Sequence, residues 1–278
     1  RDRDVTGVQT CALPIYEMFL SSLKRKSLVR QIRQVIKYAA IAAILIISTV
    51  FTTLYLNNQS SEKSLNTLYV PAGQRAKVTL QDGTEVWLNA QSTLTYPSKF
   101  SGKSRRVEVE GEAYFDVAED IKRPFIVHTQ HIDFEVLGTQ FNIYSYNESN
   151  YTEATLVEGS LKVQEKSNAQ NSVILKPNEQ LSFKDGKIAV APISNIDHLL
   201  WREGIYSFEN EKLIDILDKL ELYYDIKIIV EDPEIFNVNY TGKFRQRDGI
   251  EEILRILQII QPFDIERDRE NNTITLTK

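Results

Sequence analysis

Residues 38–56 read YAAIAAILIISTVFTTLYL, a stretch without a charged residue or a proline. As an α-helix this stretch would be about 28 Å long, close to the ~30 Å thickness of the hydrocarbon core of a bilayer. We therefore expect a single transmembrane helix over 38–56 rather than a helix buried in a soluble core. The absence of charge continues to Ser61, which leaves room for the helix to tilt.

The charges on either side of this stretch are unequal. The first charged residues after it are Glu62 and Lys63, one of each sign. Between Met18 and the stretch, by contrast, every charged residue is basic. The positive-inside rule then predicts a cytoplasmic N-terminus and an exported chain from about residue 57 onward. A cleavable signal peptide fits less well, because its apolar core is usually shorter and no small-residue cleavage site follows Leu56. The basic residues are Lys24, Arg25, Lys26, Arg30, Arg33 and Lys37.

Composition limits what the exported part can be. Residues 57–278 are enough for one large or two small domains. A net charge of −5 argues against a nucleic-acid partner. The single cysteine, Cys11, precedes the apolar stretch, so the exported part has no disulfide, and the chain has only three histidines. We expect neither a metal site nor a cofactor.

The first residues are unusual. The chain begins with Arg1 and its only methionine is Met18. Residues 1–15, RDRDVTGVQTCALPI, resemble a translated sequencing adaptor and are excluded from fold reasoning, although a genuine disordered tail is the alternative. On the first reading, residues 16–37 are the remnant of a longer cytoplasmic region, and 57–67 form a linker after the span.

From 68 to 190 the pattern is that of β-strands throughout. Short runs alternate apolar and polar residues between turn signals, as in RRVEVEGEAYFDV with Gly111 as a bulge. AKVTL and EVWLN are expected to form a hairpin across 81–84. Glycines recur at 83, 111, 138, 159 and 186. This regular spacing predicts an all-β domain, either a β-solenoid or a stacked two-sheet arrangement.

From 197 to 278 the pattern changes to that of a small α+β domain. The predicted order is β-α-β-β-α-β-β, with the two helices packed on one face of a small sheet. Asn210 is a plausible cap of the first helix, and Asp248 with Glu251 forms a capping box for the second. The predicted strands are 204–208, 225–230, 238–244, 263–267 and 273–277, and the helices are 211–224 and 249–260.

Several segments resemble the FecR family of membrane-anchored anti-sigma factors. They are YVPAGQRAKVTLQDGTEVWLNAQSTLTYP (69–97), VEVEGEAYFDVAED (107–120), PFIVHT (124–129), VLGTQFNI (136–143) and TLVEGSLKV (155–163). The C-terminal stretch, which ends FDIERDRENNTITLTK, is similar to the small domain that follows FecR domains in the Bacteroidetes type. The resemblance covers about residues 65–278 and includes the apolar stretch.

The resemblance implies a transmembrane regulator in the bacterial inner membrane. Family members hold an extracytoplasmic-function sigma factor in the cytoplasm, and a substrate-loaded TonB-dependent transporter of the outer membrane contacts their periplasmic part. Residues 197–278, similar to the signalling module of such transporters, would receive the transporter's signalling domain by strand addition. Residues 68–190 would transmit the signal. The helical sigma-binding domain of the family has no counterpart here beyond 16–37, so the resemblance implies an N-terminally truncated member.

Catalysis is not expected from the residue pattern. The alternating Glu108, Glu110 and Glu112 are expected to share one solvated strand face rather than to form a glycosidase pair. His128 and His131 have no nucleophile nearby and are interpreted as surface or packed histidines. The aromatic residues Trp87, Tyr144, Tyr146 and Tyr151 could stack on a sugar, but packing in the core or at its rim is commoner.

One chemical candidate comes from the resemblance. Some family members cleave their own backbone at a Gly-Thr bond that matches Gly138-Thr139 in LGTQF. The Thr139 hydroxyl would attack the Gly138 carbonyl, and the resulting ester would hydrolyse. The plainer reading is that Gly138 marks a β-bulge, because the sequence identifies no activating base.

Two functions therefore remain open at this stage. The first is an anti-sigma factor that relays a signal from a TonB-dependent transporter to an extracytoplasmic-function sigma factor. The alternative is a membrane-tethered periplasmic scaffold or glycan-binding protein without a sigma partner. An enzyme is not expected, apart from the Gly138-Thr139 candidate.

Overall fold

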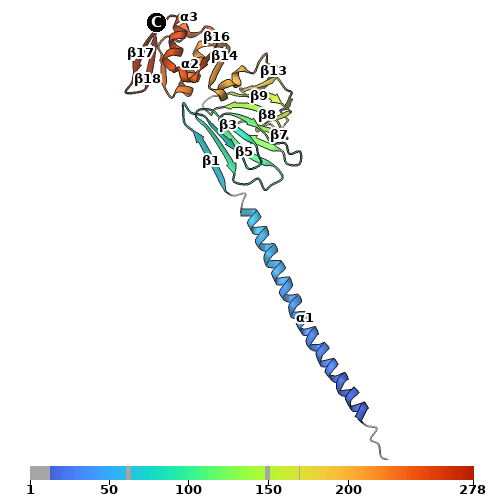
Figure 1. Ribbon diagram of the computed structural model, residues 1–278. Coiled ribbons are helices and arrows are strands. Elements are labelled where there is room, and N and C mark those ends of the chain that lie inside the picture. Colours follow the sequence, from blue (N-terminus) through green and yellow to red (C-terminus); the bar gives the residue numbers. More distant parts are fainter. Residues whose placement is uncertain (1–12, 61–63, 148–150, 169) are drawn as a thin grey trace, which may run out of the picture. The chain divides into compact units, whose positions relative to one another are not determined.

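The computed structural model describes residues 13–60, 64–147, 151–168 and 170–278. The chain divides into two units, one that ends at Gln59 and one that starts at Ser60. In the first unit the described residues form one uninterrupted helix, α1 (Leu13–Ser60) (Figure 1). Within it, Ile32–Tyr55 has a mean hydropathy of 2.1, and no part of its apolar stretch is buried by the protein. This helix is long and apolar enough to be a single membrane span.

The threonine hydroxyls of this apolar stretch are hydrogen-bonded within the helix. The hydroxyl of Thr49 donates a hydrogen bond to the carbonyl of Leu45 at 2.9 Å. Thr52 and Thr53 make the same bond to the carbonyls four residues earlier, each at 2.8 Å. A helix whose polar groups are paired internally suits a lipid environment, where water cannot replace missing partners.

The second unit begins with a β domain of two stacked layers that share one long strand. Strand β5 (Arg105–Asp116) pairs with β4 and β6 along its first half and with β3 and β8 along its second half. Gly111, with φ of 105°, lies where β5 passes from one layer to the other. A Cβ atom at this position would lie 2.4 Å from Ser92 Oγ, so only glycine fits.

The first layer, sheet A, follows the order β1-β4-β5-β6-β7-β10-β11. All neighbouring pairs are antiparallel except β5 with β6. Its other strands are β1 (Leu65–Val70), β4 (Ser92–Pro97), β6 (Phe125–His128), β7 (Ile132–Val136), β10 (Leu161–Glu165) and β11 (Ser172–Leu175).

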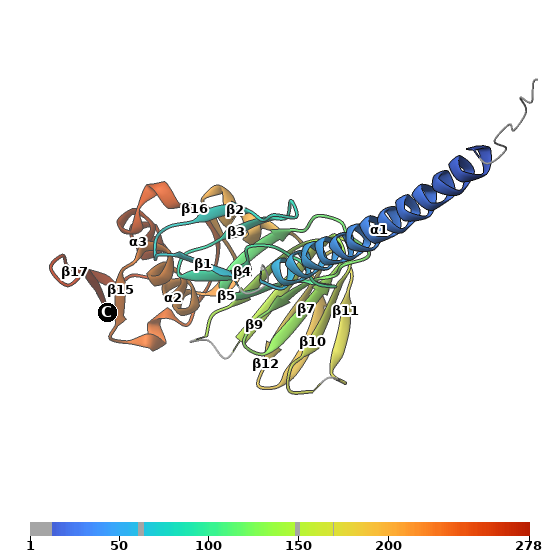
Figure 2. The ribbon, with the colours of Figure 1, turned by 90° about the horizontal axis from the view of Figure 1, so that it is seen from below.

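The second layer, sheet B, follows the order β2-β3-β5-β8-β9-β12-β13 and is antiparallel throughout. Figure 2 shows how the strands of the two layers are arranged. Its other strands are β2 (Ala76–Thr79), β3 (Glu85–Leu88), β8 (Gln140–Ser145), β9 (Tyr151–Glu158), β12 (Glu179–Lys184) and β13 (Lys187–Pro192).

The chain builds the two layers by adding hairpins to each in turn. Hairpins β6-β7 and β10-β11 extend sheet A, while β8-β9 and β12-β13 extend sheet B. The inward side chains of both layers form one hydrophobic core, in which Phe115 and Phe141 stack at 5.1 Å. The stacked two-sheet arrangement is confirmed, as is the predicted hairpin of β2 and β3.

A buried ion pair closes one end of this core. Arg105, only 1% exposed, donates to Asp82 Oδ2 at 2.8 Å and to the carbonyl oxygens of Ala118 and Arg123. A buried cation is tolerated when each of its donors is used in this way. Through these three contacts, Arg105 joins the β2-β3 turn to the loop that follows β5.

The α+β domain has the predicted order β-α-β-β-α-β-β. Short 3-10 helices, η2 (Asp197–Glu203), η3 (Pro233–Phe236) and η4 (Gln246–Asp248), join its elements. Its helices are α2 (Leu213–Tyr224) and α3 (Ile250–Ile260). Its strands are β14 (Ile205–Lys212), β15 (Lys227–Val230), β16 (Asn239–Arg245), β17 (Asp264–Asp268) and β18 (Thr273–Thr277).

Three local predictions for this domain were wrong. Its strands form two small sheets, β14-β16 and β15-β18-β17, and not one. Asn210 does not cap α2, because it sits at φ of 50° in a bulge of β14 and its side chain accepts from Asn239. The N-cap of α3 is Gly249 without a side-chain hydrogen bond, and Glu251 instead pairs with Arg267.

Candidate functional site

The α+β domain covers the outer face of sheet B. A second hydrophobic core joins Tyr114 of β5 and Ala90, just after β3, to Leu199 and Trp201 of η2 and to side chains of α2 and β14. Trp87 on β3 packs at the edge of this core. The two domains therefore share buried apolar surface, which couples their stabilities.

Polar contacts fix the position of the covering domain. The guanidinium of Arg202 lies 3.6 Å from the ring centroid of Tyr114, a close cation–π contact. Gln246 donates to the carbonyl of Gly73 at 3.0 Å. Arg75, which precedes β2, donates to the carbonyl of Trp201. The last two contacts join the loop before β2 to η4 and to η2, and the first joins η2 to β5.

Glu112 lies buried at this interface and is only 5% exposed. Its two carboxylate oxygens accept hydrogen bonds from Asn89 at 2.7 Å and Asn142 at 3.0 Å. Burial raises the pKa of Glu112 to about 7, although both amide hydrogen bonds oppose this shift. The expectation of a solvated face was correct for the exposed Glu108 and Glu110 but wrong for Glu112, because the covering domain excludes water there.

A polar cleft opens beside Glu112, between the outer face of sheet B and the α+β domain. It has a volume of about 930 Å³ and is lined from β9, β12, β14 and α2 among others. At its inner end lies a chamber of about 50 Å³ lined by Glu112, Asn142, Glu153 and Trp201 among others. Tyr144, His198 and Lys219 line both, so the chamber and the cleft adjoin.

One ion pair and two shifted pKa values describe the titratable groups of this cleft. Lys219 pairs with Glu211. Burial raises the pKa of Glu153, and hydrogen bonding to Tyr151 opposes the shift. Burial lowers the pKa of His198 to about 4, with nearby Lys219 adding to the effect, so His198 is neutral at pH 7 and shares a 2.9 Å hydrogen bond with Thr155.

Two buried polar atoms in the chamber have no hydrogen-bond partner among the residues that the structure describes. One is Asn142 Oδ1, an acceptor, and the other is Trp201 Nε1, a donor. Both residues are almost fully buried, at 4% and 2% exposed. Buried polar atoms are nearly always paired in folded proteins, so these two mark a place where a ligand or water belongs.

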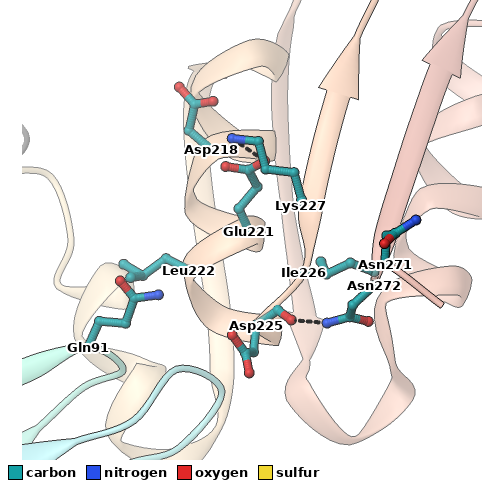
Figure 3. A pocket seen from close by; sticks show the side chains of 9 residues that line it. All are labelled: Gln91, Asp218, Glu221, Leu222, Asp225, Ile226, Lys227, Asn271 and Asn272. Carbon is teal, nitrogen blue, oxygen red and sulfur yellow. Dashed lines mark hydrogen bonds and ion pairs between the residues drawn. The ribbon is translucent and has the colours of Figure 1, made fainter. Parts of the chain in front are cut away.

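A second hollow, of about 420 Å³, lies at the end of α2 (Figure 3). Figure 3 shows Asn272 donating to the carbonyl of Asp225 and Lys227 facing Glu221, an ion pair of 3.9 Å. These groups are paired with one another. These paired groups therefore give no sign of a missing ligand.

Gly138 and Thr139 lie in the three-residue loop between β7 and β8, where the chain crosses from sheet A to sheet B. The Thr139 hydroxyl donates to the carbonyl of Ser160 at 3.1 Å. A Cβ atom at Gly138 would lie 2.9 Å from the Cα of Glu119, so the glycine allows a close approach of two chain segments. The irregular pairing lies next to this loop, between Gln140 and Phe141 of β8.

The histidines singled out from the sequence lie apart from the cleft. His128 pairs with Asp133 at 2.8 Å on the outer face of sheet A, and the ring of His131 lies 5.9 Å from that of Phe183. In the described residues no group of histidine, cysteine and acidic side chains could hold a metal ion.

The aromatic residues considered above as a sugar-stacking surface pack against other aromatic rings. Tyr144 meets Tyr146 edge-on at 4.9 Å and also meets Tyr151, while Trp87 packs edge-on against Tyr114.

Sequence reasoning missed the cleft groups Glu153, His198 and Lys219. A signal was present, because alternation places Trp87, Tyr114 and Tyr144 on the outer face of sheet B. Three large aromatic residues on one outer face indicate that another element covers it.

Comparisons with known proteins agree with this architecture. The family described as FecR protein matches residues 66–162, and the one described as FecR, C-terminal matches residues 205–276. Two crystal structures, at 1.65 Å and 2.50 Å resolution, of "a putative anti-sigma factor from Parabacteroides distasonis ATCC 8503" are similar. Each is 30% identical, with a TM-score of 0.69, over 77% of this chain and 99% of the matched chain. No curated protein matches the chain.

Proposed function

The chain belongs to the FecR family, and from this premise we propose that it is a single-pass anti-sigma factor that relays a signal across the bacterial inner membrane. The observation that carries the proposal is the similarity to the anti-sigma factor structure. That structure is 30% identical to this chain, and the match covers 99% of its length and 77% of this chain. The family and this neighbour support the anti-sigma role. The orientation, the type of sigma factor and the source of the signal are parts of the proposal.

The proposed orientation places the N-terminus in the cytoplasm and both β-rich domains in the periplasm. It rests on the basic residues before the apolar stretch of α1. Fusions of alkaline phosphatase, which is active only outside the cytoplasm, test it. A fusion after Lys278 should be active and one before Lys24 inactive, and the reverse pattern would refute the proposed topology.

On the cytoplasmic side we propose an extracytoplasmic-function sigma factor as the partner. The test uses the full open reading frame in its host, with a reporter gene under the promoter of the neighbouring sigma factor gene. Deleting the regulator gene should change reporter output at least several-fold. A rise in reporter output would identify a regulator that holds the sigma factor inactive, and a fall would identify one that activates it. Unchanged output under inducing and non-inducing conditions would contradict this part of the proposal.

On the periplasmic side we propose that the signalling domain of a TonB-dependent transporter binds the α+β domain by strand addition. Strand β17 pairs only with β18 among the described strands, and most of its side chains are exposed. Strand β15 is less open, because the outward N–H of its Ile228 donates to Glu221. An unpaired edge can accept a further strand through main-chain hydrogen bonds. The edge of β17 is therefore the proposed docking site.

Photo-cross-linking of the full chain tests this docking site. A photoreactive amino acid at Glu266 on β17 should cross-link to the transporter's signalling domain, whereas the same group at Glu108 on sheet A should not. Both positions are exposed, so the two variants are matched. Cross-linking from position 108 alone would place the receiver in the β domain.

The alternative function is a membrane-tethered scaffold or glycan-binding protein without a sigma partner. The polar cleft beside Glu112 is the observation that could favour a binding protein. A glycan array probed with the full chain, together with the reporter assay above, separates the two. Glycan binding with unchanged sigma-dependent transcription would favour the alternative.

A further inference from the structure

The cleft between sheet B and the α+β domain is acidic. Its lining includes three lysines, Lys184, Lys212 and Lys219, against five acidic residues. The chamber at its inner end adds Glu112. The acidic residues of the cleft are Glu153, Glu209, Glu211, Asp215 and Asp218.

At the inner end, acceptors with unused lone pairs lie close together. Each carboxylate oxygen accepts one hydrogen bond, on Glu112 from Asn89 and Asn142 and on Glu153 from Tyr151 and Gln180, and can accept another. The carboxylates of Glu112 and Glu153 and the amide oxygen of Asn142 line one small chamber. Lys219 is the cation of the chamber lining, and it already pairs with Glu211. Asn142 is only 4% exposed, yet its Oδ1 has no hydrogen-bond partner among the described residues. An unpaired buried acceptor beside two carboxylates that can each accept further hydrogen bonds suits a group with several N–H donors.

The walls of the chamber are aromatic. Tyr144, Tyr206 and Phe208 line it, and Lys219 Nζ already lies 5.9 Å from the ring centroid of Phe208. Aromatic faces attract cations, and the effect grows where water is excluded. A volume of about 50 Å³ admits a group the size of an ammonium ion but not a ring.

From these observations we infer that the cleft binds a primary ammonium group, with its nitrogen in the chamber among Glu112, Glu153 and Asn142 and the rest of the ligand in the outer cleft. The indole N–H of Trp201 is a donor and calls for an oxygen beside the cation, such as water or a ligand hydroxyl. The ammonium can belong to a small amine or to the lysine side chain of a peptide. The outer cleft, of about 930 Å³, has room for either.

Isothermal titration calorimetry on the full chain in detergent tests the inference. The probes are n-butylamine, its neutral isostere n-butanol, and the amides of N-acetyl-lysine and N-acetyl-norleucine. Saturable binding of an amine with at least ~10-fold preference over its neutral counterpart is expected. Tighter binding of butylamine indicates a small amine, and tighter binding of the lysine amide indicates a peptide. Absence of saturable binding of both amines, or equal binding of the neutral compounds, would overturn the inference.

Three variants locate the site. Glu153→Gln should weaken amine binding by roughly 10-fold or more, because a charged acceptor is lost. Glu108→Gln makes the same change on the exposed face of sheet A and should alter affinity less than about 2-fold. Lys219→Met should strengthen binding several-fold, because a competing cation is removed. A gain of affinity cannot come from misfolding. Equal effects of the Glu153 and Glu108 variants, or weaker binding by the Lys219 variant, would overturn the inference.

Discussion

The two outer faces of the β domain have opposite surroundings although one strand contributes to both. Glu110 and Glu112 are two residues apart on β5 and point to the same side of the strand. Glu110 is exposed on sheet A, whereas Glu112 is buried on sheet B beneath the α+β domain. Alternation along a strand specifies which side chains share a face. It does not specify whether that face meets water.

The charges on each face are arranged accordingly. On sheet A, Lys162 and Glu135 are register partners and pair at 2.9 Å in solvent, where such pairs add little stability. On sheet B, Glu112 accepts only neutral amide hydrogen bonds and titrates near neutral pH. The covered face is thus the one where single substitutions and pH should have large effects.

The largest expected effect comes from removing the aromatic anchor of the covered face. Trp201→Ala should lower the free energy of unfolding by about 3–5 kcal/mol, because Trp201 is 2% exposed and its loss leaves a cavity. Ile174→Ala on the open face of sheet A should change it by less than about 0.5 kcal/mol. Urea unfolding of the full chain in detergent, followed by near-UV circular dichroism, measures both. Similar losses would mean that the two faces do not differ in this way.

The next effect is the pH dependence that Glu112 introduces. Its pKa is about 7 in the folded chain against 4.5 for an unperturbed glutamate, so Glu112 binds more protons in the folded state between these values. Glu112 should therefore contribute a fall in the free energy of unfolding as the pH rises from about 4.5 to 7, by up to about 3 kcal/mol. His198, whose pKa burial lowers to about 4, opposes this fall between about pH 4 and 6.5. The groups facing Glu112 include Tyr144 from β8, Glu153 from β9 and Lys219 from α2.

Two variants isolate this contribution. Glu112→Gln should make the free energy of unfolding fall less, or rise more, between pH 4.5 and 7 than in the parent chain, because the contribution of Glu112 is gone. Glu110→Gln, on the open part of the same strand, should leave the slope unchanged. The measurement is urea unfolding at half-unit steps of pH. A slope in the Glu112 variant equal to that of the parent chain would assign the titration to other groups.

A smaller effect is expected from the cation–π contact of Arg202 with Tyr114. Arg202→Ala should destabilise the chain by about 1–2 kcal/mol, because the guanidinium lies 3.6 Å from the ring centroid in a partly buried setting. Arg106→Ala is the matched change, since Arg106 is exposed on sheet A. Chemical unfolding compares the two variants. Equal stability of both would show that the covering domain does not depend on this contact.

Local patterns predicted most of the fold. The order of all seven elements in the α+β domain follows from alternation, helical period and turn residues in nearby sequence. The same patterns predicted an all-β first domain but left a β-solenoid and two stacked sheets as alternatives, and the structure shows the stacked sheets. The helix caps were wrong because tertiary contacts decided them: Asn210 accepts from Asn239 of β16, and Glu251 pairs with Arg267 of β17. Sequence could not reveal the cleft, because it forms only where β9 and β12 meet β14 and α2.

The last prediction concerns the crossing between the open and the covered sheet, at Gly138-Thr139. For self-cleavage, the Thr139 hydroxyl would have to lose its proton and attack the preceding carbonyl. Instead it donates to Ser160, and among the described residues no side-chain base is hydrogen-bonded to it. The loop is also held by Asp120 N–H to the Leu137 carbonyl at 2.8 Å and by Val117 N–H to the Thr139 carbonyl at 3.1 Å. We expect the chain to remain intact.

Intact-mass spectrometry of the purified chain tests this expectation over days at neutral pH. Thr139→Ala is the informative variant and should cost only about 1 kcal/mol through one lost hydrogen bond. Gly138→Ala is unsuitable, because its methyl group would lie 2.9 Å from the Cα of Glu119 and disturb the fold by itself. If the parent chain yields fragments that end at Gly138 and begin at Thr139, and the Thr139 variant does not, the loop cleaves itself. The crossing between the two sheets would then be a reactive element as well as a structural one.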